Sequence, residues 1–397
     1  MYIYAGSITE STGSLKGSGK GITVFSFDGE HLQKLQEVED VQPSILKVYG
    51  DRLYCTNEVK DFTGLNGSGG GVSAYAVNKT DGTIQKISQS ISYGSRPSYV
   101  VKSDDGKHLF VTNHGSHTTV TCHYIKNNLG QFVLERQFDD SSVAMFAVQK
   151  DGSIGNLQDL QVIHGSGYWC HGGGQSTSHL HCVKTQGEYI YTCNRGKDTI
   201  EVFTYKNNRL QLIQEYQCPY GYAPRHMEIS KEYACVLYEN YPAVSLFQVK
   251  LGKLHELDIT ITMPATYYDV YPLPHFDKPH ADKEEINTCG MADKRRAMPS
   301  DIHVFKEYVY VSNRCFSSFG TISLLKMEKE KLAYTASYTL PGKDPRGFAV
   351  SKDGNYLFVA LCDTGKIYVY ALDPLTKEIV KEVDHIDCPG VSSLAVV

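Results

Sequence analysis

Five side chains that can move protons or bind anions occupy the same position in a repeating pattern. In each repeat an apolar strand ends in a two-residue polar step, and the second residue of that step carries the reactive group. These residues are Glu58, His114, Arg195, Glu239 and Arg314. Carboxylates and imidazoles serve as acids and bases, and guanidinium groups bind anions through parallel donors. If the fold gathers them, they form an acid/base and anion-binding site.

A second reactive set lies on the short strands that precede these steps. We predict that these strands open at Pro43, Pro97, Ser178, Pro224, Pro299 and Pro345. Their side chains include His179, His181, Arg225, His226, Asp301, His303 and Arg346. Side chains alternate along a strand, so His179 and His181 are expected to share one face. Both should then line the same space.

The elements that position these residues recur along the chain. Each step is followed by an alternating or β-branched strand such as Gly71–Val77, and then by a less regular stretch such as 210–216. Units of roughly 50 residues with strand signals and no helical spacing are typical of a propeller. The sequence therefore predicts an all-β fold with four strands in each unit.

The two chain ends complete one unit only when they are joined. Residues 2–4 and 21–25 have strand character but lack an opening strand, whereas residues 392–397 have the pattern of one. We therefore predict a seven-bladed β-propeller whose first blade is closed by the C-terminal strand, which removes two exposed edges. The whole chain, 1–397, is then a single domain, with inserted loops near 119–140, 165–176 and 263–298.

A propeller brings equivalent positions to one height around a central axis, so the charged steps should meet at one channel mouth. The sixth step, Leu361-Cys362, carries no charged group. We therefore expect the site to lie off the axis, toward the blades that carry His179, Glu239 and Arg314.

Composition excludes several classes of partner. The net charge is −5, the pI is near 6.3 and no stripe of Lys and Arg is present, which argues against nucleic acid or a membrane as partner. Strand residues follow Met1 directly and no leader pattern is seen, so we predict a cytoplasmic protein. The 11 cysteines form no CxxC pair and are expected to be reduced.

We predict no cofactor and no metal. Cys170 and His171 could add to His179 and His181 as ligands, but their spacing matches no closed zinc pattern. The sequence makes no prediction about the oligomeric state.

At these residues the chain resembles the seven-bladed β-propeller lactonases, a family that includes bacterial 6-phosphogluconolactonases and the fungal 3-carboxy-cis,cis-muconate lactonizing enzyme. The resemblance extends over nearly the full length. It is carried by Gly21-Ile22, Pro43-Ser44 with Asn57-Glu58, residues 71–75, Pro224-Arg225-His226 with Glu239, Asp301-Ile302 with Ser312-Asn313-Arg314, and Pro345-Arg346-Gly347-Phe348. The chain departs from the family at Tyr238 and at Leu361-Cys362, where Asn and Asn-Gln are usual, and in a longer loop at 272–296.

The resemblance implies a catalytic set and a reaction. The catalytic residues would be His179 or His181 together with Arg225, Glu239 and Arg314. Residues assigned to substrate binding are Arg195, His226, Asp301, Arg346, Glu58 and His114. Opening a lactone requires a base for the attacking water and cationic donors at the oxyanion. Glu239 or His179 would be the base, and Arg225 and Arg314 would hold the oxyanion and an acidic group of the substrate.

The expected function is hydrolysis of a sugar lactone similar to 6-phosphogluconolactone, with a small anionic sugar lactone or related carboxylate as partner. Two alternatives are a muconate-type lactonizing enzyme, which is a cycloisomerase, and a non-catalytic propeller that binds a ligand. For Glu239, Arg225 and Arg314 the alternative to a role in the site is a structural ion-pair network between blades. The convergence of arginines, an acid and a histidine pair favours an enzyme.

Overall fold

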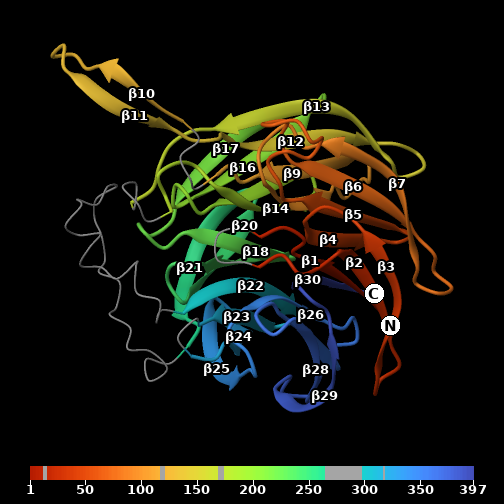
Figure 1. The fold of residues 1–397 in the computed structure, drawn as a ribbon. Coiled ribbons are helices and arrows are strands. Elements are labelled where there is room, and N and C mark those ends of the chain that lie inside the picture. Colours follow the sequence, from red (N-terminus) through yellow and green to blue (C-terminus); the bar gives the residue numbers. More distant parts are fainter. Residues whose placement is uncertain (12–15, 117–120, 169–173, 264–296, 316–317) are drawn as a thin grey trace.

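Each predicted repeat folds into one antiparallel sheet of four strands, and the sheets surround a common axis (Figure 1). The computed structural model describes residues 1–11, 16–116, 121–168, 174–263, 297–315 and 318–397. Within these residues seven four-stranded sheets are present. The prediction of an all-β, seven-bladed propeller is confirmed. No helix in these ranges is long and apolar enough to cross a membrane.

The strands of the first four blades are given from the axis outward. Blade 1 contains β30 (Val391–Val396), β1 (Tyr2–Ser7), β2 (Gly21–Phe27) and β3 (Leu32–Glu39). Blade 2 contains β4 (Pro43–Tyr49), β5 (Arg52–Asn57), β6 (Gly71–Val77) and β7 (Ile84–Ile91). Blade 3 contains β8 (Pro97–Lys102), β9 (His108–Asn113), β12 (Ser141–Val148) and β13 (Ile154–Ile163). Blade 4 contains β14 (Leu180–Gln186), β15 (Tyr189–Asn194), β16 (Thr199–Lys206) and β17 (Arg209–Gln217).

The last three blades follow the same order. Blade 5 contains β18 (Pro224–Ser230), β19 (Tyr233–Tyr238), β20 (Ala243–Lys250) and β21 (Lys253–Ile261). Blade 6 contains β22 (Met298–Phe305), β23 (Tyr308–Arg314), β24 (Thr321–Glu328) and β25 (Lys331–Thr339). Blade 7 contains β26 (Pro345–Val350), β27 (Tyr356–Leu361), β28 (Lys366–Leu372) and β29 (Ile379–Asp387).

The C-terminal strand closes the ring, as predicted. β30 pairs with β1 in antiparallel register, with Tyr4 opposite Ala395 and Ala5 opposite Leu394. The two chain ends therefore lie in one sheet, and both edges that the open chain would expose are paired.

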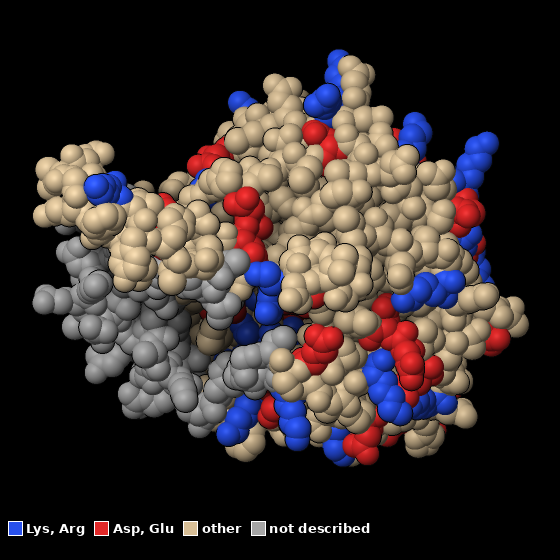
Figure 2. All heavy atoms as spheres, turned by 45° about the horizontal axis from the view of Figure 1, so that its top comes forward, with Lys and Arg blue, Asp and Glu red and all other residues tan. Residues whose placement is uncertain are grey.

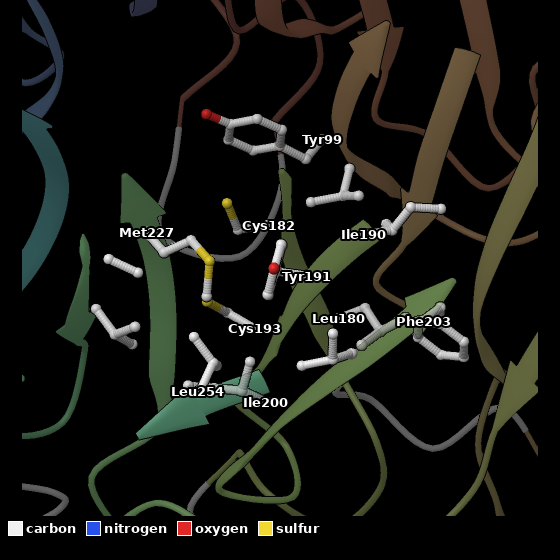
Figure 3. Packing of buried hydrophobic residues seen from close by; sticks show 14 of the residues in the cluster. Tyr99, Leu180, Cys182, Ile190, Tyr191, Cys193, Ile200, Phe203, Met227 and Leu254 are labelled. Carbon is white, nitrogen blue, oxygen red and sulfur yellow. The ribbon is translucent and has the colours of Figure 1, made fainter. Parts of the chain in front are cut away.

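The apolar core lies between the blades. In Figure 3, side chains from blades 3, 4 and 5 point toward one another, with Tyr99, Leu180 and Met227 among them. Buried tyrosines also join successive blades: the Tyr54 hydroxyl donates to the Gly152 carbonyl oxygen at 2.8 Å. The Tyr4 and Tyr310 hydroxyls likewise each donate to a backbone carbonyl oxygen of the next blade, at 3.0 and 2.6 Å respectively. A hydroxyl that would cost free energy if buried alone is thus paired in each case.

Every innermost strand carries a β-bulge near its start, which the sequence did not predict. The bulged residues are Ser44, Ser98, His181, Arg225, Ser300, Arg346 and Ser392. A bulge adds one residue to a strand and re-aims the side chains that follow it. The bulges therefore decide which side chains face the channel.

The bulges correct one prediction. The innermost strand of blade 4 begins at Leu180, not at Ser178, so His179 precedes the strand and does not alternate with His181 along it. His181, not His179, is therefore equivalent to Arg225 and Arg346. The error arose because this blade has no opening proline to mark the strand.

One insertion forms a hairpin that projects from the body of the propeller (Figure 1). It consists of β10 (Thr121–Lys126) and β11 (Phe132–Gln137), and it falls within the predicted insertion at 119–140. Most of the predicted insertion at 263–298 lies outside the described residues, and so do residues 169–173 of the insertion predicted at 165–176, which include Cys170 and His171.

Candidate active site

The first residue of the polar step holds the strand end in place. Asn57, Asn113, Asn194 and Asn313 are all fully buried. The Asn194 amide, for example, donates to Ser178 Oγ at 2.8 Å and to Glu201 Oε1 at 3.0 Å. These asparagines stabilise the end of the strand within the blade, whereas the second residue of the step provides the charge at the channel mouth.

The second residue of the step is held by its own backbone. The amides of Glu58, His114 and Glu239 each donate to the carbonyl oxygen of the residue before the innermost strand of the same blade. The acceptors, Gln42, Arg96 and Ala223, have left-handed φ values of 44, 53 and 61°. Such a conformation is uncommon outside glycine, and it recurs here at equivalent positions. This repeated backbone conformation therefore fixes the position from which each charged side chain extends.

Glu239 lies among three guanidinium groups. Its Oε2 is 2.6 Å from Arg195 Nε and 3.6 Å from Arg225 Nε, and its Oε1 accepts from Arg314 Nη2 at 2.8 Å. All four side chains are buried. Blades 4, 5 and 6 supply them, which is the off-axis position predicted from the loss of charge at Leu361-Cys362.

The cluster carries more positive than negative charge. Burial opposes ionisation of Glu239, but Arg195, Arg314 and Arg225 hold the pKa of its carboxyl well below the usual value. One carboxylate therefore faces three cations. Such an excess favours a bound anion or a developing oxyanion.

A single buried carboxylate, Asp198, positions two members of this cluster. Its Oδ1 accepts from the Ala223 amide at 2.8 Å and from Gln175 Nε2 at 2.7 Å. The Ala223 carbonyl in turn accepts from the Glu239 amide at 2.8 Å, and Gln175 Nε2 also donates to the Arg195 carbonyl at 2.7 Å. Asp198 is thus connected to both partners of the Arg195–Glu239 pair.

His114 and His179 form a stacked pair beside the cluster. Their ring centroids are 4.5 Å apart with an interplanar angle of 13°, and His179 Nδ1 lies 2.9 Å from the His114 carbonyl oxygen. A carbonyl only accepts, so His179 carries its proton on Nδ1. Burial, and then the charge of Arg195, lowers the pKa of His179 to about 3. The ring is therefore neutral near neutral pH.

His181 and His226 continue the row of imidazoles into the channel. Their centroids lie 5.1 Å apart, and His181 meets His114 edge to face at 5.4 Å. Burial, followed by the charges of Arg225 and His226, lowers the pKa of His181 well below its ordinary value. Its Nδ1 is buried without a hydrogen-bond partner among the described residues. His181 is thus a neutral imidazole whose ring makes no hydrogen bond to a described residue.

His226 is held by its neighbours on both sides. Arg225 Nη1 lies 3.4 Å from Nε2, and Nδ1 lies 2.8 Å from Asp301 Oδ1. Because Arg225 can only donate, Nδ1 carries the proton and donates to Asp301. Arg225 also donates to the Ser300 carbonyl oxygen. These contacts connect blades 5 and 6 at the level of the bulges.

Arg346 and Glu58 lie apart from the Glu239 cluster. Arg346 pairs with Asp344 at 3.5 Å, and Glu58 makes no ion pair with any described residue. Both line the channel cavity. Of the five steps predicted to meet, those of Arg195, Glu239 and Arg314 are in direct contact, His114 packs beside them on His179, and Glu58 stands separately.

A cavity of about 270 Å³ extends along the channel from the position of Arg346 and Glu58. Its lining includes Glu58, His181, Arg225, Arg346, His226 and Asp301, and further in Lys47, Glu228 and His303. Figure 2 shows a hollow in this part of the surface, with Lys or Arg atoms visible at its floor. Lys47 and Glu228 were missed in the sequence, because each lies three residues beyond a bulge that no pattern revealed.

Fold and site together define a seven-bladed β-propeller with an arginine-rich acid/base site at one end of its channel. The family model described as "Lactonase, 7-bladed beta-propeller" matches residues 2–396. The chain belongs to this family of lactone hydrolases.

Individual relatives are distant but match along most of their length. A 6-phosphogluconolactonase of Formosa agariphila is 23% identical over 99% of this chain and 98% of its own. A 6-phosphogluconolactonase of Bacillus subtilis is 22% identical over 76% of this chain and 80% of its own. The solved structure of a periplasmic gluconolactonase from Pseudomonas aeruginosa has a TM-score of 0.75 and 23% identity, and the match covers 99% of this chain and 98% of that one. This structural likeness supports the fold.

Proposed function

We propose that the protein hydrolyses a sugar lactone at the Glu239 cluster. The observation that carries the proposal is the set of three buried guanidinium groups, from Arg195, Arg225 and Arg314, around one ionised carboxylate. Membership of the lactonase family and the names of the relatives, two 6-phosphogluconolactonases and a gluconolactonase, support the same substrate class.

The arginines stabilise the charge that develops at the lactone carbonyl. When water attacks the carbonyl carbon, its oxygen becomes an oxyanion, and Arg225 and Arg314 offer donors that are already in place. Donors held in a site with little water are worth more than in bulk solvent. Arg195 and Arg346 add positive charge for an acidic group of the substrate, either a carboxylate or a phosphate.

His181 acts as the base in this proposal. Glu239 is ionised but engaged by three arginines, whereas His181 is neutral and its ring makes no hydrogen bond to a described residue. A ring nitrogen of His181 takes a proton from the attacking water, and the charge of Glu239 offsets part of the repulsion between the resulting imidazolium and the neighbouring arginines. The same proton then passes to the ring oxygen as its bond to the carbonyl carbon breaks. The product is the open-chain hydroxy acid.

A pH-stat assay tests the proposal with gluconolactone and 6-phosphogluconolactone, after subtraction of the uncatalysed rate. Arg314→Ala is expected to lower kcat/KM by about 100-fold or more, with partial recovery on addition of guanidinium chloride at low concentration. His181→Gln should lower kcat by about 100-fold, the usual contribution of a general base. Lys107→Met, at an exposed lysine, should have no effect. If the wild-type protein opens neither lactone, the proposal is wrong.

The sequence also predicted an alternative to hydrolysis, the lactonizing reaction, and a cytoplasmic location. The lactonizing reaction is tested by following the ultraviolet absorbance of a carboxymuconate in the presence of the protein. A cytoplasmic location is tested by cell fractionation with an antibody against the chain.

A further inference from the structure

The inner part of the channel holds a second group of charged side chains, which the reaction above does not use. Lys47, Lys184, Glu228 and His303 lie on the innermost strands of blades 2, 4, 5 and 6, each three residues beyond the bulge. Lys184 Nζ donates to Glu228 Oε1 at 2.7 Å. The Nζ atoms of Lys47 and Lys184 lie 4.9 and 5.2 Å from the ring centroid of Tyr99.

Several of these groups have hydrogen-bonding capacity to spare. The Lys47 ammonium group forms no hydrogen bond or ion pair with any described residue, and within the same ranges the ring nitrogens of His303 form no hydrogen bond. Glu228 and Asp301 each use one carboxylate oxygen, for Lys184 and for His226 and the Ile302 amide respectively. Lys47, Glu228, Asp301 and His303 all line the cavity of about 270 Å³. Both donors and acceptors are thus presented to one enclosed space.

Together with Asp301, which lines the same cavity, this group has balanced charges. Two ammonium groups, of Lys47 and Lys184, stand beside two carboxylates, of Glu228 and Asp301. Burial lowers the pKa of His303 below its ordinary value, with a further contribution from the charges of Lys47 and Lys184 and against the opposing charges of Glu228 and Asp301, so this ring is neutral. A balanced set of donors and acceptors does not select a ligand by its net charge. It matches a molecule with many hydroxyl groups, because each hydroxyl both donates and accepts.

The opposite wall leaves room for such a molecule. Gly347, Ala349, Ser393 and Ala395, from blades 7 and 1, line the same cavity with small side chains. The cavity is also lined by His181 and Arg225, which belong to the proposed reaction site. One ligand can therefore contact both the reaction site and the inner group.

We infer that this inner group binds the hydroxyl-bearing part of the lactone, and that Lys47 and His303 determine specificity for a polyhydroxylated substrate. The inference rests on the proposed function because it takes lactone hydrolysis as the reaction. The nature of the ligand is inferred from the residues that line the cavity. The arginine cluster receives the carbonyl and any acidic group, whereas the inner cavity recognises the hydroxyl groups.

The first test compares gluconolactone with δ-valerolactone, which has the lactone but no hydroxyl groups. Lys47→Met and His303→Phe are each expected to lower the ratio of the two kcat/KM values by roughly 10- to 100-fold, the range for hydrogen bonds to a charged or buried polar group. Lys107→Met, far from the cavity, should leave the ratio unchanged. If each variant lowers kcat/KM for the two lactones by the same factor, Lys47 and His303 do not recognise the hydroxyl groups and the inference is wrong.

The second test does not depend on hydrolysis. Ligand-observed NMR measures binding of anhydroglucitol, a ring polyol without a carbonyl, and of tetrahydropyran, the same ring without hydroxyls. The wild-type protein should bind the polyol and not tetrahydropyran, and Lys47→Met should weaken polyol binding about tenfold or more. Equal binding of both rings, or polyol binding unaffected by Lys47→Met and His303→Phe, would overturn the inference. Failure of all lactone hydrolysis with intact polyol binding would instead remove only the proposed reaction.

Discussion

Arg195 Nε and Glu239 Oε2 lie 2.6 Å apart, although the two residues come from the same repeat position in successive blades. Equivalent positions in neighbouring blades normally carry similar side chains because they meet similar surroundings. Here they carry opposite charges, and Arg314 in the next blade continues the alternation with a 2.8 Å contact to Glu239. The ring geometry of the propeller thus turns one repeated position into a cluster of ion pairs.

The Glu239 cluster should be important for stability as well as for chemistry. Glu239→Gln removes the one carboxylate among three buried arginines, and breaking a buried ion pair in this way costs about 3 to 5 kcal/mol. We expect that loss in the free energy of unfolding measured by urea denaturation. Glu215→Gln, at a half-exposed pair with Lys197, should cost under about 1 kcal/mol. Equal effects of the two substitutions would contradict the buried cluster.

His179 should make the stability of the protein depend on pH. Its pKa is about 3 in the folded protein against 6.5 ordinarily. Because the folded value is the lower one, its contribution is present above pH 6.5 and is lost as the pH falls toward 3, at about 1.4 kcal/mol per pH unit. His179→Gln should therefore flatten the curve of unfolding free energy against pH in this window. His31→Gln, at an exposed ring, serves as control, and an unchanged slope in His179→Gln would refute the assignment.

Asp198 should affect catalysis without touching the substrate. In Asp198→Asn, an amide replaces one of two oxygens that accept from Ala223, Gly221, Gln175 and Tyr168. The shift of Arg195 and Glu239 should lower kcat by about tenfold or more, since small displacements at a reacting centre are costly, while KM changes less. Asp258→Asn, at a carboxylate that accepts from the Leu332 amide on outer strands, should leave kcat unchanged. A change in melting temperature alone would mean that Asp198 is only structural.

The tyrosines that join the blades should each contribute a measurable amount. Tyr54→Phe removes the buried hydroxyl bond to Gly152 and should lower the free energy of unfolding by about 1 to 3 kcal/mol, because the carbonyl oxygen remains buried without this partner. Tyr124→Phe, on the exposed face of the projecting hairpin, should have no measurable effect. Unfolding followed by circular dichroism distinguishes the two outcomes.

The fold could be predicted from the sequence because a repeat is a redundant signal. Apolar strands, polar steps and opening prolines recur, so an irregular unit is corrected by its neighbours. The C-terminal strand was predictable for the same reason, since 392–397 has the pattern that the first unit lacks.

The site was only partly predictable, and the bulges explain why. The residues at the steps follow a visible pattern, and Arg195, Glu239 and Arg314 do meet. Beyond a bulge the alternation of side chains is displaced by one residue, so Lys47 and Glu228 could not be assigned to the channel from alternation alone. In the inner strands Leu46, Val183 and Met227 are buried, and each is followed directly by a charged residue. That register places Lys47, Lys184 and Glu228 on the channel side.

Closure of the first blade by β30 has a consequence for how the protein is made. Residues 392–397 line the cavity, and they follow blades 2 to 7 along the chain. Those six blades can therefore be synthesised in order before the pairing partner of β1 and this part of the channel wall exist. A chain that stops before β30 would lack both the closing strand of blade 1 and one side of the cavity.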